Sequence, residues 1–164
     1  MKKAILFLSI AFCLFGCKQK EEAFPEQVQL GKEFGLKYQG KTTLAVANSS
    51  STSIVFSNLK ESRCIGENIV CISAGVLNFD LNFSDGQILS FGVTDWLTDK
   101  KVSYSDKDLN QNPKRISVKL DGPSSGNANL LVYVERVEIK DPNRQAISAT
   151  PKENYTLRLK IVRE

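Results

Sequence analysis

The chain has 164 residues, with 22 Lys or Arg, 18 Asp or Glu, a formal net charge of +4 and no histidine. Without histidine, Ser-His-Asp and Cys-His catalysis and every imidazole-dependent metal centre are excluded, so an enzyme would have to use carboxylate, Lys, Tyr or Ser-Lys chemistry. The basic residues are scattered and do not alternate with aromatic residues, which argues against a nucleic-acid partner.

The N-terminal segment MKKAILFLSIAFCLFGC has two lysines followed by an apolar run from Ala4 to Phe15. The run suits the h-region of a signal peptide and is too short to span a bilayer. The quartet LFGC at 14–17 then resembles the lipobox of bacterial lipoproteins. This resemblance implies that residues 1–16 are removed and that Cys17 carries acyl chains, which anchor the protein to the membrane. An ordinary secretory signal and an uncleaved membrane helix remain the alternatives.

Residues 17–26 are charged, contain a proline and lack apolar periodicity, which is typical of a flexible tether. Glu21 and Glu22 resemble the acidic export signal of Bacteroidota-type surface lipoproteins, although a plain solvated linker has the same composition. We therefore expect an outer-membrane lipoprotein of the cell envelope, on its periplasmic or its surface-exposed face. Residues 27–164 are long enough for one domain with a core of its own.

Beyond residue 41, apolar and polar residues alternate with a period of two, as in strands with one buried and one solvated face. The clearest case is 76–94, where Asp85-Gly86 predicts a hairpin because a glycine accepts a positive φ. Seven to nine short strands separated by Gly, Pro and Ser turns predict an all-β fold, an antiparallel β-sandwich that is immunoglobulin-like or related. The expected strand segments are 42–47, 52–59, 77–83, 89–93, 116–120, 130–139 and 155–161.

Two cysteines, Cys64 and Cys71, lie in the segment ESRCIGENIVCISAG and remain after signal-peptide removal. A zinc site would need further Cys or His ligands, a redox pair needs two intervening residues instead of six, and a catalytic thiol would lack its histidine base. In an exported protein the pair predicts a disulfide between strands. Its loop-closure contribution is about 2.5 kcal/mol. Free or transient thiols are the alternative.

The same segment resembles the SRCP…CxWAG signature of small, largely uncharacterised bacterial lipoproteins of the Bacteroidota type. Ser62-Arg63-Cys64 and Cys71-Ile72-Ser73-Ala74-Gly75 carry the resemblance, and Ile65 and Ser73 stand where that signature has Pro and Trp. The resemblance implies a β-rich domain across most of 27–164 and an address in the cell envelope. It implies no catalytic activity.

Trp96 and Arg63 are the candidate contact residues of the sequence. Trp96 follows a strand end and is either a ligand contact or an anchor at the rim of the core. Arg63 is expected to be displayed to solvent on the stapled loop. Any contacts are expected from loops at one end of the sandwich, with 95–114 and 121–129 favoured because they are long and polar.

Two weaker patterns concern carboxylates. Asp106, Asp108 and Asn110 have the first spacings of a calcium loop, but the later glycine and glutamate are missing, so a solvated loop is the default and no metal or cofactor is predicted. Asp80 and Asp85 flank the expected hairpin and are the candidates for a paired-carboxylate hydrolase.

These observations lead us to expect a lipid-anchored envelope lipoprotein that acts as a non-enzymatic binding or structural module. Its partners are the membrane, through the N-terminal lipid, and an undetermined protein or glycan. The alternatives are a carboxylate-dependent envelope hydrolase and an inhibitor of an extracellular enzyme.

Overall fold

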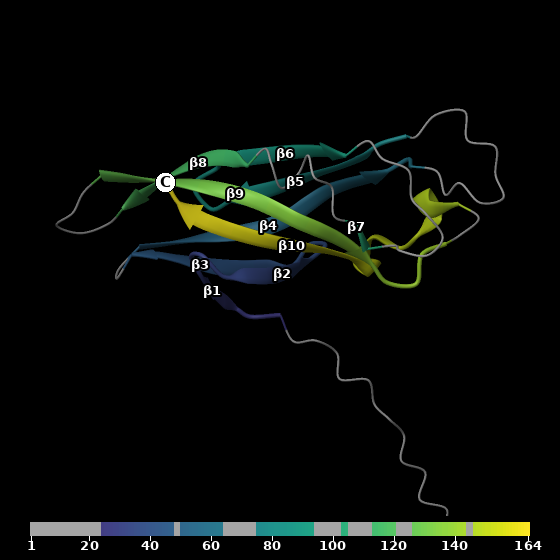
Figure 1. Cartoon of the computed structure of the whole chain (residues 1–164), viewed down its shortest axis with the longest axis horizontal. Helices are drawn as coiled ribbons and strands as arrows, with labels where there is room; N and C mark the ends of the chain where they lie inside the picture. Colours follow the sequence, from purple (N-terminus) through teal and green to yellow (C-terminus); the bar gives the residue numbers. More distant parts are fainter. Residues whose placement is uncertain are drawn as a thin grey trace, which may run out of the picture.

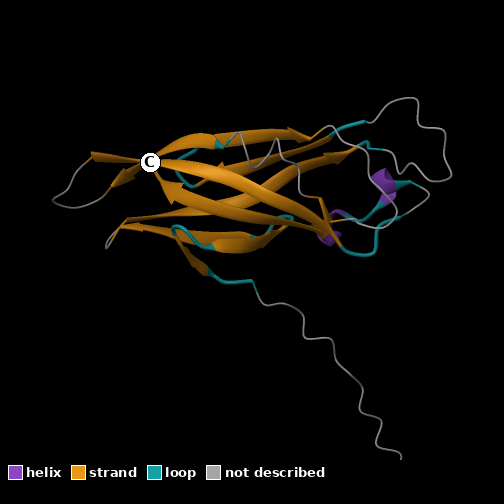
Figure 2. Cartoon of the chain, viewed as in Figure 1, coloured by secondary structure: helices purple, strands orange, loops and turns teal. Residues whose placement is uncertain are grey.

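Strands form almost all of the regular structure in the computed structural model, which describes residues 24–47, 50–63, 75–93, 103–104, 113–120, 126–143 and 146–164 (Figure 1). Figure 2 shows two layers of strands, with short helical turns near one end. Within these ranges there are ten strands and two 3-10 helices. The strands are β1 (Gln27–Gln29), β2 (Glu33–Lys37), β3 (Lys41–Ala47), β4 (Ser50–Glu61), β5 (Leu77–Phe83), β6 (Ile88–Val93), β7 (Ser103–Tyr104), β8 (Lys114–Leu120), β9 (Gly126–Ile139) and β10 (Tyr155–Arg163), and the 3-10 helices are η1 (Ile147–Ala149) and η2 (Lys152–Asn154).

The strands form two sheets that pack face to face. The first sheet has the order β1-β3-β4-β5-β6, and the second has the order β2-β10-β9-β7, with β8 also paired to β9. All pairs are antiparallel except β1 with β3, which is parallel. The predicted all-β sandwich is confirmed.

All seven expected strand segments are present, and β1, β2 and β7 are additional. The additional strands are short or interrupted, so they lack the extended alternation that identifies a strand in a sequence. β1 and β7 have three and two residues, and Gly35 interrupts the apolar pattern of β2.

The β5–β6 hairpin is confirmed, and residues 84–87 connect its two strands. Gly86 N donates to Phe83 O over 3.0 Å, and Phe83 N donates to Gln87 O over 2.9 Å. Gly86 has a φ of +86°, so the loop is a tight turn closed by a glycine in the left-handed region.

The core lies between the sheets and includes a row of aromatic rings from the first sheet. Phe56 and Phe79 meet edge to face at 5.6 Å, and Phe79 stacks on Phe91 at 5.2 Å. Tyr38 contacts Phe56 at 5.4 Å from the turn after β2. On the facing strands β9 and β10, Leu130, Val134 and Leu159 are fully buried. Apolar burial from both layers stabilises the sandwich.

The two long edges of the sandwich, with β1, β2 and β3 along one and β6 and β8 along the other (Figure 1), are closed in different ways. At one edge, β1 and β2 belong to different sheets and are joined by residues 30–32, and β2 is joined to β3 by residues 38–40. At the other edge, β6 and β8 are bridged by side chains. Gln87 Nε2 donates to Ser117 O at 2.6 Å, its Oε1 accepts from Ser117 N at 3.3 Å, and Lys114 Nζ donates to Ser90 O.

The expectation that the contact loops lie at one end of the sandwich is wrong. Val93, the last residue of β6, pairs with Leu77, and Leu77 pairs with Glu61, which contacts Tyr155. β6 therefore ends at the end of the sandwich where Tyr155 lies opposite Ile139 of β9. Leu120 ends β8 opposite Gly126, at the far end of β9. Residues 126–129 also belong to β9, because their backbone continues the ladder with β8. The two long connections therefore leave the sandwich at opposite ends.

Residues 24–26, before the first strand, contact β2 and β3. The Phe24 ring covers Gly35, where a Cβ would come within 2.4 Å of Phe24 Cε1. Thr42 Oγ1 donates to Pro25 O over 2.8 Å, and Thr43 N donates to Glu26 O over 2.9 Å. These contacts hold residues 24–26 against β2 and β3. None of the helices in the described ranges has the length and apolarity needed to cross a bilayer.

Candidate functional site

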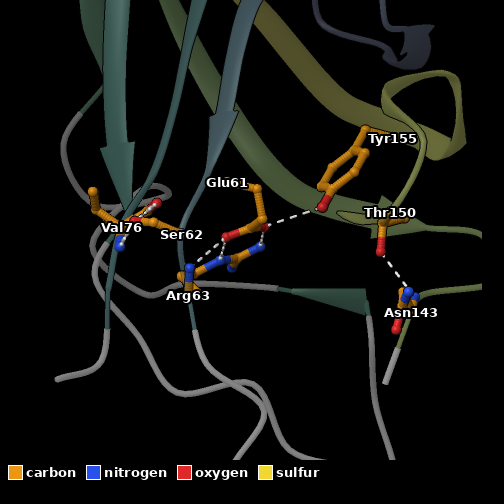
Figure 3. A network of polar contacts seen from close by, with 7 residues as sticks. All are labelled: Glu61, Ser62, Arg63, Val76, Asn143, Thr150 and Tyr155. Atoms are coloured by element: carbon orange, nitrogen blue, oxygen red, sulfur yellow. Dashed lines mark hydrogen bonds and ion pairs between the residues drawn. The ribbon is translucent and has the colours of Figure 1, made fainter. Parts of the chain in front are cut away.

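Arg63 is buried in an ion pair and is not displayed to solvent as expected. Its Nε donates to Glu61 Oε1 at 2.8 Å and its Nη2 donates to Glu61 Oε2 at 2.5 Å (Figure 3). The side chains of Arg63 and Glu61 are 0% and 5% exposed. A guanidinium loses its hydration when it is buried, and this two-point contact with a carboxylate offsets the loss. Arg63 is therefore a structural residue at the end of β4.

The ion pair also connects the two sheets. Glu61 ends β4 in the first sheet, and Tyr155 begins β10 in the second. The Tyr155 hydroxyl donates to Glu61 Oε2 at 3.3 Å, so the carboxylate lies between Arg63 and the tyrosine (Figure 3). Burial and the neighbouring Glu61 carboxylate raise the pKa of Tyr155 far above its usual range. The hydroxyl therefore stays protonated and acts as a hydrogen-bond donor at physiological pH.

Beside this ion pair, the residues that follow β4 and those that precede β5 lie against each other. Ser62 N and Oγ each donate to Val76 O at 2.9 Å, and Val76 N donates to Ser62 Oγ at 2.9 Å (Figure 3). Gly75 has a φ of +68°, and a Cβ at this position would lie 2.0 Å from Ser62 O. Only glycine combines this conformation with such a close approach.

Three positions of the cysteine-containing segment thus have structural roles. Ser62 and Gly75 hold the segments after β4 and before β5 together, and Arg63 is fixed by Glu61. We call these residues, with Val76 and Tyr155, the loop-base cluster. The charges of Arg63 and Glu61 offset each other, and Tyr155 donates to the same carboxylate. The cluster therefore has a structural role, which is to connect the two sheets.

A second feature lies on the outer face of the second sheet. Tyr133 and Glu135 of β9 and Lys160 and Val162 of β10 line a surface hollow of about 320 Å³. The residues between them in sequence, such as Val134 and Ile161, are buried in the core, so the four lining side chains point outward. All four are half-buried. We call this feature the outer hollow.

A β-bulge lies beside the outer hollow. Arg158 pairs with Arg136, but the next residue, Leu159, pairs with Val134. β9 therefore carries one more residue, Glu135, than β10 between these pairs. A bulge bends the strand and re-aims side chains, and bulges are frequent next to functional sites.

A row of ion pairs borders the hollow along the same face. Arg136 Nε contacts Glu138 at 2.7 Å and Arg136 Nη2 contacts Glu33 at 3.3 Å, while Arg158 Nε contacts Glu138 at 3.0 Å. These pairs link β2, β10 and β9.

The outer hollow was missed in the sequence. The run LLVYVERVEI predicts a strand, but Tyr133 and Lys160 look like ordinary outward residues of separate strands. One signal is present: Glu135 and Arg136 are adjacent polar residues that interrupt the alternation, and such an interruption indicates a bulge. The pairing of β9 with β10, which brings the four side chains together, cannot be obtained from the alternation.

Asp80 and Asp85 occupy separate places. Asp80 Oδ2 accepts from Asn58 Nδ2 at 2.8 Å on the outer face of the first sheet, whereas Asp85 Oδ1 accepts from Gln87 N at 3.1 Å in the hairpin loop. Residues 80 to 83 alone extend about 10 Å along β5. Glycosidase carboxylates face each other about 5–10 Å apart. This geometry does not favour the pair as catalytic residues.

The other predicted site residues lie outside the described part of the chain. They are the lipidation candidate Cys17, the disulfide candidates Cys64 and Cys71, the contact candidate Trp96, and the calcium-loop candidates Asp106, Asp108 and Asn110. Their assignments stay predictions from the sequence.

No protein-family profile matches the chain, and no curated protein or solved structure matches it either. The resemblance to bacterial lipoproteins therefore rests on the sequence, on residues 14–17, 21–22 and 62–75.

Proposed function

We propose that this protein is a lipid-anchored lipoprotein of the cell envelope whose β-sandwich acts as a non-enzymatic binding module. The observation that carries the binding role is the outer hollow. It combines an aromatic ring, an aliphatic side chain and two opposite charges on rigid strands. Rigid elements position contact groups better than loops do, and concave sites with a few polar groups are typical of ligand binding.

The anchoring role rests on the sequence of residues 1–17. Phe24 packs on Gly35, and Pro25 accepts a hydrogen bond from Thr42. Cys17 lies seven positions before Phe24. Several acyl chains on Cys17 would hold the domain at the membrane stably. The envelope is also an oxidising location, which favours a Cys64–Cys71 disulfide.

The lipid and the disulfide are tested by intact-mass measurement of the protein purified from its membrane. We expect acyl chains on a chain that begins at Cys17, and a mass lower by two hydrogens than that of the reduced form. A Cys17→Ala variant should leave the membrane fraction. Retention of that variant in the membrane would show that the anchor is assigned wrongly.

The binding role is tested by sedimentation of the mature protein, kept in detergent, with delipidated envelope material, so that the acyl chains on Cys17 cannot carry the protein into the pellet. We expect the wild type to co-sediment and a Tyr133→Ala variant to remain mostly in the supernatant. The matched control is Ile88→Ser, which removes an exposed apolar side chain from the first sheet. Equal sedimentation of the wild type and the Tyr133→Ala variant would refute a role for the outer hollow.

A further inference from the structure

The composition of the outer hollow indicates the chemical class of its ligand. Tyr133 and Lys160 are directly opposite each other across the β9–β10 pair. Val162 lies two residues after Lys160, on the same face of β10, and Glu135 lies two residues after Tyr133, on the same face of β9. The hollow therefore has an aromatic and aliphatic part together with one carboxylate and one ammonium group.

A ring with an apolar face and polar edges matches this arrangement. The face of a pyranose sugar carries C–H groups, which pack on an aromatic ring, and its hydroxyls both donate and accept hydrogen bonds. Glu135 can accept from such hydroxyls and Lys160 can donate to them, and hydrogen bonds with a charged partner are the stronger kind. The two charges offset each other, which favours a neutral ligand over a phosphate or another anion.

The size of the hollow agrees with a small ligand. Its volume of about 320 Å³ lies at the lower limit of ligand sites in proteins, about 300–1,000 Å³. This is room for one or two sugar rings, whose further residues would extend over the open face of the sheet. A chain of sugars at the cell envelope is accessible to a domain that is tethered there.

We propose that the outer hollow binds a neutral pyranose unit of an envelope glycan. The ring stacks on Tyr133 beside Val162, and its hydroxyls bond to the Glu135 carboxylate and the Lys160 ammonium group. This proposal rests on the binding role proposed above and adds the class of ligand. It involves no bond cleavage.

The direct test uses the mature full-length protein in a detergent without a sugar headgroup. The probe is an array of defined neutral oligosaccharides of glucose, galactose, mannose and N-acetylglucosamine. We expect the wild type to bind at least one of them. Tyr133→Ala should weaken that binding at least about tenfold, since it removes most of an aromatic contact. Tyr133→Phe keeps the ring and should bind nearly as well as the wild type.

The polar contacts are tested with nearly isosteric variants. Lys160→Met and Glu135→Gln should each weaken binding about three- to tenfold. Ile88→Ser should bind as the wild type does. All variants change half-buried or exposed side chains, and unchanged thermal unfolding will show that they fold.

A treatment of envelope material separates failure of this proposal from failure of the binding role. Periodate cleaves vicinal diols of sugars, and a protease removes proteins. Loss of Tyr133-dependent sedimentation after periodate supports the glycan, as does binding on the array. Sedimentation that depends on Tyr133 but is lost only after protease would overturn the glycan proposal and leave the binding role intact. No sedimentation of the wild type would overturn both.

Discussion

The buried ion pair between Arg63 and Glu61 gives the sharpest test of the fold. Replacing Arg63 by Met leaves the Glu61 carboxylate, whose side chain is only 5% exposed, without its two-point guanidinium contact. Removing one partner of a buried ion pair costs about 3–5 kcal/mol. We therefore expect Arg63→Met to lower the free energy of unfolding by about that amount, which is a large part of the stability of an ordinary domain.

A matched exposed pair serves as the control. Arg136 and Glu138 have the same spacing in sequence and a similar Nε–Oε1 distance, 2.7 Å compared with 2.8 Å. Their side chains are 41% and 30% exposed. Water therefore screens this pair, and Arg136→Met should cost at most about 1 kcal/mol. The difference between the two variants isolates the effect of burial.

The assay is urea unfolding of the full chain at neutral pH, followed by far-ultraviolet circular dichroism. The double variant Glu61→Leu with Arg63→Met completes a double-mutant cycle. It should recover much of the loss, because replacing both charges by apolar groups leaves no uncompensated buried charge. The reasoning is refuted if Arg63→Met costs no more than Arg136→Met, or if the effects of the Glu61 and Arg63 substitutions simply add.

Three further predictions concern single side chains. Gly75→Ala should destabilise the protein by about 2–4 kcal/mol in the same urea assay, because the new Cβ meets Ser62 O at 2.0 Å. Gly86→Ala, which has a positive φ but no atom within 4 Å of the new Cβ, should cost only about 1–2 kcal/mol, and equal costs would contradict the role of the close approach. Because the pKa of Tyr155 is raised from its model-compound value of 10.0, the unfolded state loses this proton first, so stability should decrease as the pH rises above about 10. Tyr155→Phe should make that alkaline decrease shallower in thermal unfolding at graded pH, and an unchanged slope would exclude the buried hydroxyl as its cause.

Much of the fold could be predicted because strands with one buried face repeat every two residues. Leu77 to Phe83 shows this pattern, and Asp85-Gly86 locates the turn after it. The chemistry of turns and the period of strands are local properties, so they can be read without the structure. The parallel strand β1 could not be found in this way. Its three residues pair with β3, and so short a segment has no period of its own.

The candidate site could be predicted less well, because it depends on which strands become neighbours. Arg63 was expected in solvent since charged residues are mostly exposed. Its burial depends on Glu61 two residues earlier and on Tyr155, more than 90 positions later. Tyr133 and Lys160 likewise meet only through the register of β9 and β10. Such contacts between distant parts of the chain leave no local pattern.

The two long edges of the sandwich differ in how they connect the sheets, and this difference determines at which edge the sheets separate first. Two three-residue connections, 30–32 and 38–40, tie the sheets together at β1, β2 and β3. Across the opposite edge, within the described residues, side-chain hydrogen bonds of Gln87 and Lys114 connect the sheets. A fluctuation that separates the sheets can break these contacts one by one, while the backbone holds the first edge closed. Amide protons of β6 and β8 should therefore exchange with solvent before those of β3 and β10, and a protease should reach the core first between β6 and β8.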